Sequence, residues 1–283
     1  MTNLIASGAG TVTVGDMTVN RLGFGAMRLT GRGIWGPPAD PEECKRVLRR
    51  AVELGVNLFD TADSYGPHVS EELIAEALYP YPDGMVIATK AGFTRSAPDR
   101  WAPDGRPEHI RQAIEGSLRR LRLERIDLYQ VHTPDRKVPY AETVGVFRDL
   151  QQAGLVRHIG VSNVSLEQLG VARGIVEVVS VQNRYNLTDR ASEPVLEACT
   201  RDGVAFIPWY PLATGKLAGE AIERVASRRG LTPVQVGLAW LLQHSPVMIP
   251  IPGTSKVNHL EENLAVAEVD LTDEDIRELR GSA

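Results

Sequence analysis

Four polar side chains in the first half of the sequence have the types and spacing that proton transfer to a carbonyl group requires. They are Asp60, Lys90 and His132, which each close a short apolar run, and Tyr65, five residues after Asp60. A phenol with a pKa of about 10 is a weak acid at neutral pH, but a nearby ammonium group stabilises the phenolate and lowers that pKa. We therefore expect Lys90 to lower the pKa of Tyr65, which would donate a proton to a carbonyl oxygen.

The carboxylate and the imidazole complete this chemistry. A lysine at the inner end of a strand is desolvated and needs a counter-charge, which Asp60 supplies. His132 is placed to hydrogen-bond the same carbonyl oxygen and orient the substrate. The alternative is a structural ion pair beside a buried histidine, and the presence of four such residues at three successive strand ends disfavours it.

Eight short apolar runs, separated by helical patterns, must position these residues. Prolines and capping residues begin helices at Asp40-Pro41, Arg106-Pro107 and Thr232-Pro233. Near-continuous apolar strands joined by helices indicate parallel pairing, in either a doubly wound sheet or a closed barrel. Eight units in about 250 residues, without a GxGxxG after the first strand, favour a (β/α)8 barrel. The eight runs are RLGFGAM (21–27), VNLFD (56–60), MVIATK (85–90), IDLYQVH (126–132), VRHIGVSN (156–163), VVSVQN (178–183), VAFIPW (204–209) and VMIPIPG (247–253).

Residues 1–283 are predicted to form one domain with two additions to the barrel. A β-hairpin is expected around Gly15-Asp16, and a last amphipathic helix is expected to begin at Thr272. Strand alternation predicts which side chains share the barrel interior with the polar set. Those expected to point inward are Leu58, Ala88 and Gln130, and those expected to face the helices are Phe59, Ile87 and Val131.

Composition excludes several classes of function. A formal charge of -5 argues against nucleic-acid or anionic-membrane partners, and no apolar stretch is long enough for a membrane helix. The two cysteines, Cys44 and Cys199, have no CxxC or histidine partner, so we expect no bound metal and no disulfide framework. A cytoplasmic protein, monomeric or weakly oligomeric, fits these features.

The Asp, Tyr, Lys, His set and the motifs around it resemble the aldo-keto reductase superfamily. GFGAMRL, FDTADSYG, IATK, IGVSN, VQNRYN and IPGTSKVNHLEENL occur in order along nearly the whole chain. The resemblance implies a (β/α)8 barrel that reduces aldehydes and ketones with NAD(P)H, with Asp60, Tyr65, Lys90 and His132 as the catalytic tetrad.

The resemblance also implies a cofactor site. Ser162, Asn163 and Gln182 would bind the nicotinamide carboxamide, and the ring of Trp209 would stack on the nicotinamide. The other residues implied are Gly25, Ala26, Met27, Asp60, Tyr210, Pro211, Leu212, Gly253, Thr254, Ser255, Lys256, His259, Glu262 and Asn263.

The loop before the last part of this site suits a phosphate, because hydroxyl groups and free N–H groups precede a helix there. Gly253 and His259 stand where many members of the family carry the Lys and Arg that hold the 2′-phosphate. We expect Thr254, Ser255 and Lys256 to hold that phosphate instead, with NADPH preferred over NADH and with Glu262 and Asn263 near the adenine.

Substrate identity is less constrained by the sequence. Met27, Trp35 and Trp101 are the candidate pocket walls around Tyr65 and His132, and apolar walls suit an aromatic or aliphatic aldehyde. The IPGTS and HLEEN segments are similar to those of bacterial members, some of which reduce pyridoxal. Two alternatives stay open: a cofactor-binding regulatory subunit built on the same barrel, and a lyase in which Lys90 forms a Schiff base.

Overall fold

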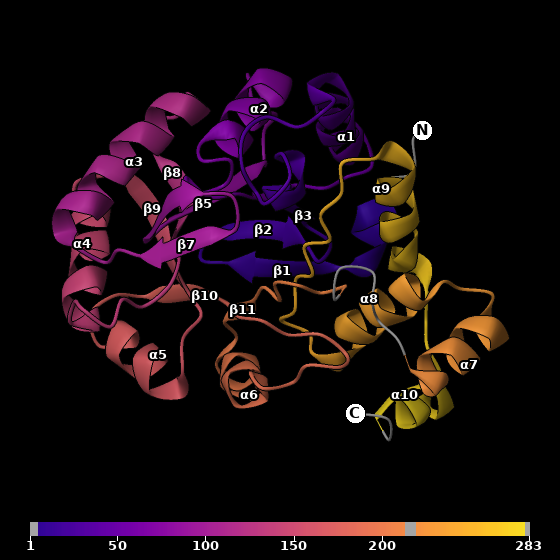
Figure 1. The fold of residues 1–283 in the computed structure, drawn as a ribbon. Helices are drawn as coiled ribbons and strands as arrows, with labels where there is room; N and C mark the ends of the chain where they lie inside the picture. The colour runs from indigo at the N-terminus through magenta and orange to yellow at the C-terminus, as the bar shows by residue number, and fades with distance from the viewer. Residues whose placement is uncertain (1–4, 213–218, 281–283) are drawn as a thin grey trace.

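The computed structural model describes residues 5–212 and 219–280, and its centre is a curled sheet of seven parallel strands (Figure 1). The strand order is β11-β10-β9-β8-β5-β4-β3, so consecutive strands of the chain are neighbours. The strands are β3 (Phe24–Gly25), β4 (Leu58–Asp60), β5 (Val86–Ala91), β8 (Ile126–Val131), β9 (Val156–Ser162), β10 (Val178–Gln182) and β11 (Ala205–Phe206).

The eighth expected run closes the barrel without forming a regular strand. Phe206 exchanges backbone hydrogen bonds with Val247 and Ile249, at 2.9 and 2.8 Å. On the other side of this run, the N–H of Gly23 donates to the carbonyl of Pro250 at 3.0 Å. The run therefore bridges β11 and the beginning of β3, which confirms the (β/α)8 architecture. Its prolines have no N–H group to donate, which explains the interrupted pairing.

Helices cover the outside of the barrel, as the sequence predicts. Asp40 caps α1 by accepting from the N–H of Glu43, and Thr232 and Gln235 form a reciprocal capping box on α8. The helices are α1 (Pro41–Glu53), α2 (Val69–Leu78), α3 (Pro107–Leu121), α4 (Tyr140–Gln152), α5 (Leu166–Arg173), α6 (Glu193–Asp202), α7 (Glu220–Arg229), α8 (Pro233–His244), α9 (Val257–Leu264) and α10 (Asp273–Arg280), with short 3-10 turns η1 (Ile5–Ala9), η2 (Ala26–Leu29) and η4 (Ala265–Glu268). Within the described ranges, no helix is long and apolar enough to cross a bilayer.

The two apolar clusters of the protein confirm the predicted inward and outward faces. Leu58 and Ala88 belong to the inner cluster, whereas Phe59, Ile87 and Val131 pack with the helices in the outer cluster. The inner cluster also contains the apolar residues of the predicted hairpin, β1 (Thr11–Val14) and β2 (Met17–Asn20). In Figure 1 this hairpin crosses the centre of the ring of strands, so it fills one end of the barrel.

A second hairpin was not expected from the sequence. It consists of β6 (Phe93–Ala97) and β7 (Arg100–Pro103), which pair antiparallel directly after β5. Since it leaves the carboxyl end of a barrel strand, it lies at the mouth where active sites of such barrels are found. It brings Trp101 toward the residues that close β4, β5 and β8.

Candidate active site

Lys90 lies in the barrel interior and is held by an ion pair. Its side chain is 0% exposed, and its Nζ lies 2.7 Å from Asp60 Oδ2 and 2.7 Å from the carbonyl oxygen of Thr61. Asp60 pairs with Ala88 across the strands, so Lys90 occupies the next inward position toward the mouth. Burial lowers the pKa of Lys90, but the adjacent Asp60 outweighs that effect, and the net shift is upward. The lysine is therefore charged at neutral pH.

Tyr65 reaches the same ammonium group from the loop between β4 and α2. Its hydroxyl oxygen lies 3.4 Å from Lys90 Nζ, and its side chain is buried at 7% exposure. The expected direction of its pKa shift is wrong: burial raises the pKa of Tyr65 above 10, and the charge of Lys90 offsets only part of that rise. The phenol is thus fully protonated at neutral pH, which is the state that a proton donor requires.

His132 follows β8 and faces Tyr65 across the mouth. The two rings make an edge contact with centroids 5.8 Å apart, and the Ser64 hydroxyl lies 3.4 Å from His132 Nδ1. Burial and the charge of Lys90 hold the pKa of His132 well below its usual range. The imidazole is consequently neutral at pH 7, with Nε2 left for a ligand.

Asp60 connects the ion pair to two other strands. Its Oδ1 accepts hydrogen bonds from Gln130 Nε2 at 3.0 Å and from Gln182 Nε2 at 2.8 Å. Gln130 was predicted from the sequence to point into the interior, but no function was predicted for it. Gln130 lies two residues before His132 on the same inward face of the strand, and this spacing could have indicated that it belongs to the site.

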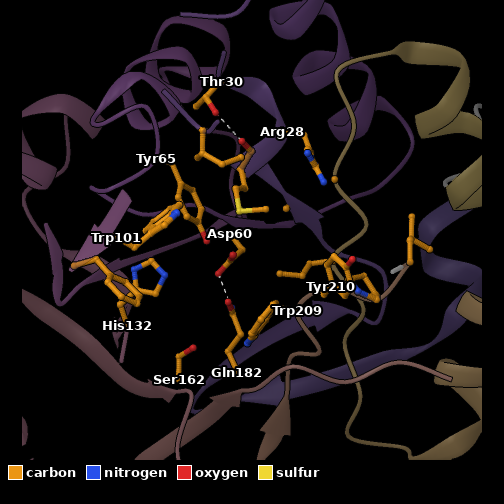
Figure 2. Close-up of a pocket in the computed structure, with 18 of the residues that line it drawn as sticks. Arg28, Thr30, Asp60, Tyr65, Trp101, His132, Ser162, Gln182, Trp209 and Tyr210 are labelled. Carbon is orange, nitrogen blue, oxygen red and sulfur yellow. Dashed lines mark hydrogen bonds between the residues drawn. The ribbon is translucent and has the colours of Figure 1, made fainter. Parts of the chain in front are cut away.

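The residues expected at the nicotinamide end are brought together beside Asp60 (Figure 2). Asn163 has a positive φ of 58°, which turns its side chain back so that Nδ2 donates to the carbonyl of His132 at 2.9 Å. Its Oδ1 accepts from Trp209 Nε1 at 2.9 Å and fixes the indole. Asn163 Nδ2 also donates to Ser162 Oγ at 3.1 Å, so the amide of Asn163 is largely committed to holding its neighbours.

These groups line one large cavity of about 1260 Å³. Figure 2 shows Tyr65, Trp101 and His132 grouped on one side of it, with Trp209 and Tyr210 on another. Of the residues expected at the site, those in the lining are Gly25, Met27, Asp60, Tyr65, Trp101, His132, Ser162, Asn163, Gln182, Trp209, Tyr210, Pro211, Leu212, Gly253, Thr254 and Ser255.

Seven expected residues lie outside this lining. Lys90 is behind Asp60 and Tyr65, and Trp35 is turned away to lie near the guanidinium of Arg95, at 5.8 Å. Trp35 is therefore a wrong prediction for a pocket wall. Ala26 is buried behind the cavity, and Lys256, His259, Glu262 and Asn263 belong to α9 or the residue before it, beyond the lining.

Several residues of the cavity lining were not predicted from the sequence. Phe93 packs against His132 with ring centroids 4.7 Å apart, and Ile34 completes the apolar wall. Arg28 and Arg32 add two guanidinium groups, and Figure 2 shows Arg28 beside the loop that precedes α9. These residues come from the 3-10 turn η2, the loop after it and the second hairpin, whose positions the ends of the barrel strands do not determine.

The cavity fits a phosphorylated dinucleotide in size and in polar groups. In the described part of the chain, the backbone N–H groups of Thr254 and Ser255 donate to no protein acceptor, and the guanidinium of Arg28 has no ion-pair partner. The loop passes close to β3 at Gly253, where a Cβ would lie 2.3 Å from the carbonyl oxygen of Gly25. Unpaired donors and positive charge beside an open loop suit phosphate oxygens.

A barrel whose cavity is lined by a protonated phenol and a neutral imidazole, with a buried ammonium group beside the phenol, is suited to proton transfer at a carbonyl oxygen. Comparison with known proteins agrees: residues 21–283 match the Aldo/keto reductase family. The chain belongs to this family, and it is an NAD(P)H-dependent oxidoreductase of the carbonyl-reducing kind.

Two curated relatives and one solved structure illustrate the similarity. An uncharacterized oxidoreductase of Schizosaccharomyces pombe is 52% identical over 271 residues, covering 95% of this chain and 88% of the relative. Pyridoxine 4-dehydrogenase of Escherichia coli is 44% identical over 279 residues, covering 96% and 97%. An aldo/keto reductase from Klebsiella pneumoniae, crystallised with NADP and acetate, superposes with a TM-score of 0.80 at 26% identity, covering 95% and 93%.

Proposed function

We propose that this single-domain enzyme reduces aldehydes or ketones to alcohols with NADPH, and that Tyr65 is the proton donor. When bound, the nicotinamide supplies a hydride to the carbonyl carbon. The hydroxyl of Tyr65 gives its proton to the carbonyl oxygen, so the product is the alcohol and the residue becomes a phenolate. The ammonium of Lys90, 3.4 Å away, stabilises that phenolate until water returns the proton.

The remaining members of the tetrad have distinct roles in this proposal. Asp60 keeps Lys90 charged in the interior through the 2.7 Å ion pair. In this proposal the neutral imidazole of His132 carries its hydrogen on Nε2, which donates to the substrate oxygen, while Nδ1 accepts from the Ser64 hydroxyl 3.4 Å away. The observation that carries the proposal is the convergence of the phenol, imidazole and ion pair at the mouth of one cavity.

The preference for NADPH has two supports. The solved relative from Klebsiella pneumoniae holds NADP, and the cavity of this chain carries two guanidinium groups, Arg28 and Arg32. We propose that Gln182, Ser162 and the Trp209 ring receive the nicotinamide. Thr254 and Ser255 would receive phosphate oxygens through their free N–H groups, and Lys256 adds positive charge nearby.

The substrate is proposed to be a small aldehyde with an apolar or aromatic body. Phe93, Trp101, Ile34 and Met27 form the wall next to Tyr65, and such side chains bind rings and alkyl chains. The name of the Escherichia coli relative makes pyridoxal, reduced to pyridoxine, the specific compound to test. A Schiff-base lyase is disfavoured, because Lys90 is fully buried and does not line the cavity.

The proposal is tested by following NADPH absorbance with pyridoxal, benzaldehyde and short aliphatic aldehydes. Wild-type protein is expected to oxidise NADPH only when a carbonyl compound is present, and Tyr65→Phe is expected to lose at least about a hundredfold in kcat. Tryptophan fluorescence titrations with NADPH and NADH report binding independently of turnover. Tight NADPH binding without turnover of any aldehyde would instead indicate the regulatory, cofactor-binding alternative.

A further inference from the structure

Arg95 on β6 joins three separate loops at the mouth of the barrel. Its Nη1 donates to the carbonyl oxygens of Ile34 and Ser64, both at 2.9 Å, and its Nη2 donates to that of Gly33 at 2.9 Å. Its Nε donates to the carbonyl oxygen of Arg100 at 3.0 Å, across the hairpin. One side chain thus connects the loop after η2, the loop that carries Tyr65, and the β6–β7 hairpin.

The same guanidinium lies on the back of the substrate wall. Its central carbon is 3.6 Å from the ring centroid of Trp101, which is a close cation–π contact. Trp101 lines the cavity and makes edge contacts with Tyr65 and Phe93, at centroid distances of 6.2 and 5.5 Å. Arg95 itself does not line this cavity, so any effect on substrate passes through the residues that it holds.

We propose that Arg95 is a positioning residue that sets the size and shape of the substrate wall, and thereby favours aldehydes with an aromatic ring. It fixes Trp101 by the cation–π contact, and it fixes Ile34 and the loop of Tyr65 through their backbone carbonyls. This inference deepens the proposed carbonyl reduction and rests on it. Trp101 and Ile34, two of the walls that Arg95 aligns, line the same cavity as Tyr65, and an aromatic ring contacts such walls over a larger apolar area than a short alkyl chain does.

The guanidinium is required for this arrangement. A guanidinium group has five N–H donors in one plane, so it can bind four carbonyl oxygens that lie in different directions. The face of the same plane remains free to stack on an indole ring. A lysine has three donors on a single nitrogen and cannot bind all four acceptors while it stacks. We therefore expect Arg95→Lys to resemble Arg95→Met more than the wild type.

Arg21 provides a matched control at a site away from the cavity. It also binds three backbone carbonyls, those of Leu242, Ser245 and Met248, at 2.5, 2.7 and 3.3 Å. It is partly buried and absent from the cavity lining. Arg21→Met should therefore lower thermal stability as Arg95→Met does, without a change in substrate preference.

The experiment compares benzaldehyde, whose ring presents a large apolar surface to Trp101 and Ile34, with propanal, whose short chain presents little. For Arg95→Met and Arg95→Lys, we expect kcat/KM for benzaldehyde to fall about tenfold or more, mainly through KM. For propanal we expect a fall of less than about threefold. Equal losses for both aldehydes, or the same shift in preference in Arg21→Met, would overturn the proposal.

A spectroscopic measurement separates this proposal from the proposed function. Removal of the cation, 3.6 Å from the Trp101 ring and 5.8 Å from the Trp35 ring, should change the tryptophan emission spectrum of the apoprotein, and the change should be much smaller in a Trp101→Phe background than in a Trp35→Phe background. If no aldehyde is reduced but the emission change occurs, the proposed activity fails while the contact to Trp101 stands. If aldehydes are reduced and no emission change or altered preference is found, the positioning role is refuted.

Discussion

The Asp60–Lys90 ion pair should be one of the most sensitive points of the molecule, and Asp60→Asn tests this. Lys90 is fully buried and has three oxygen neighbours: Asp60, the Thr61 carbonyl and the Tyr65 hydroxyl. Neutralising Asp60 leaves an ammonium group in the barrel interior without a counter-charge. Asparagine has only one acceptor oxygen, so its NH₂ group would face either Lys90 Nζ or the Nε2 donors of Gln130 and Gln182, all of which now donate to Asp60.

The magnitude follows from the cost of a buried charge. Removing one partner of a buried ion pair typically destabilises a protein by about 3–5 kcal/mol. For a chain of this length each kcal/mol corresponds to roughly 2–4 °C in the midpoint of unfolding, so we expect a decrease of roughly 6–20 °C. Differential scanning calorimetry at pH 7 measures it. Asp16→Asn is the control, because Asp16 is exposed in its ion pair with Arg157 and should cause a much smaller shift.

A double variant distinguishes the charge argument from a general effect of core substitutions. Asp60→Asn with Lys90→Met removes both charges, so the uncompensated ammonium is gone, and much of the lost stability should return. Activity should not return, because no cation remains beside Tyr65. A double variant as unstable as the sum of the two single variants would refute the reasoning.

Three further predictions concern ionisation and packing. The ultraviolet difference between wild type and Tyr65→Phe should show no phenolate from Tyr65 below a pH of about 10, since burial raises its pKa; a signal between about pH 7 and 9 would contradict this. Burial raises the pKa of Asp63 well above its usual range, so the free energy of unfolding of the wild type should fall by about 1.4 kcal/mol per pH unit as pH rises from about 4 toward that pKa. Asp63→Asn should therefore become more stable relative to the wild type between pH 5 and 8 in urea unfolding, and a stability difference that stays constant over this range would contradict the prediction. Gly253→Ala should destabilise by about 1–3 kcal/mol, because its Cβ would lie 2.3 Å from the carbonyl oxygen of Gly25, whereas Gly145→Ala, with no atom within 4 Å, should not.

The residues that close strands could be predicted from the sequence, because a strand fixes both position and direction. Asp60 and Lys90 end apolar runs that pair in parallel, so their meeting at the mouth follows from topology and alternation alone. The same reasoning placed Gln130 inside and Phe59 outside, as the structure has them. The eighth run was located correctly, although its prolines prevent regular pairing.

The loop-borne part of the site could not be predicted, because nothing local fixes where an irregular segment lies. Trp35 and Trp101 were equal candidates for the wall. The β6–β7 hairpin and Arg95 hold Trp101 at the cavity, whereas Trp35 is held outside the lining by backbone contacts with Gly31 and Gly66. The predicted direction of the pKa shift of Tyr65 was wrong for a related reason. Its neighbour Lys90 was visible in the sequence, but the depth of burial that outweighs the effect of that neighbour was not.

Asp60 also explains why the catalytic and cofactor-binding parts of the cavity are aligned. Its two oxygens accept from Lys90 on β5, Gln130 on β8 and Gln182 on β10, so one carboxylate fixes side chains from three strands. Gln182 lies at the proposed nicotinamide end of the cavity, and Lys90 lies beside Tyr65, the proposed proton donor. Because both bind the same carboxylate, the proposed site of hydride delivery and the proposed site of protonation are fixed relative to each other. Such alignment is what a reaction with two transfers at one carbonyl group requires.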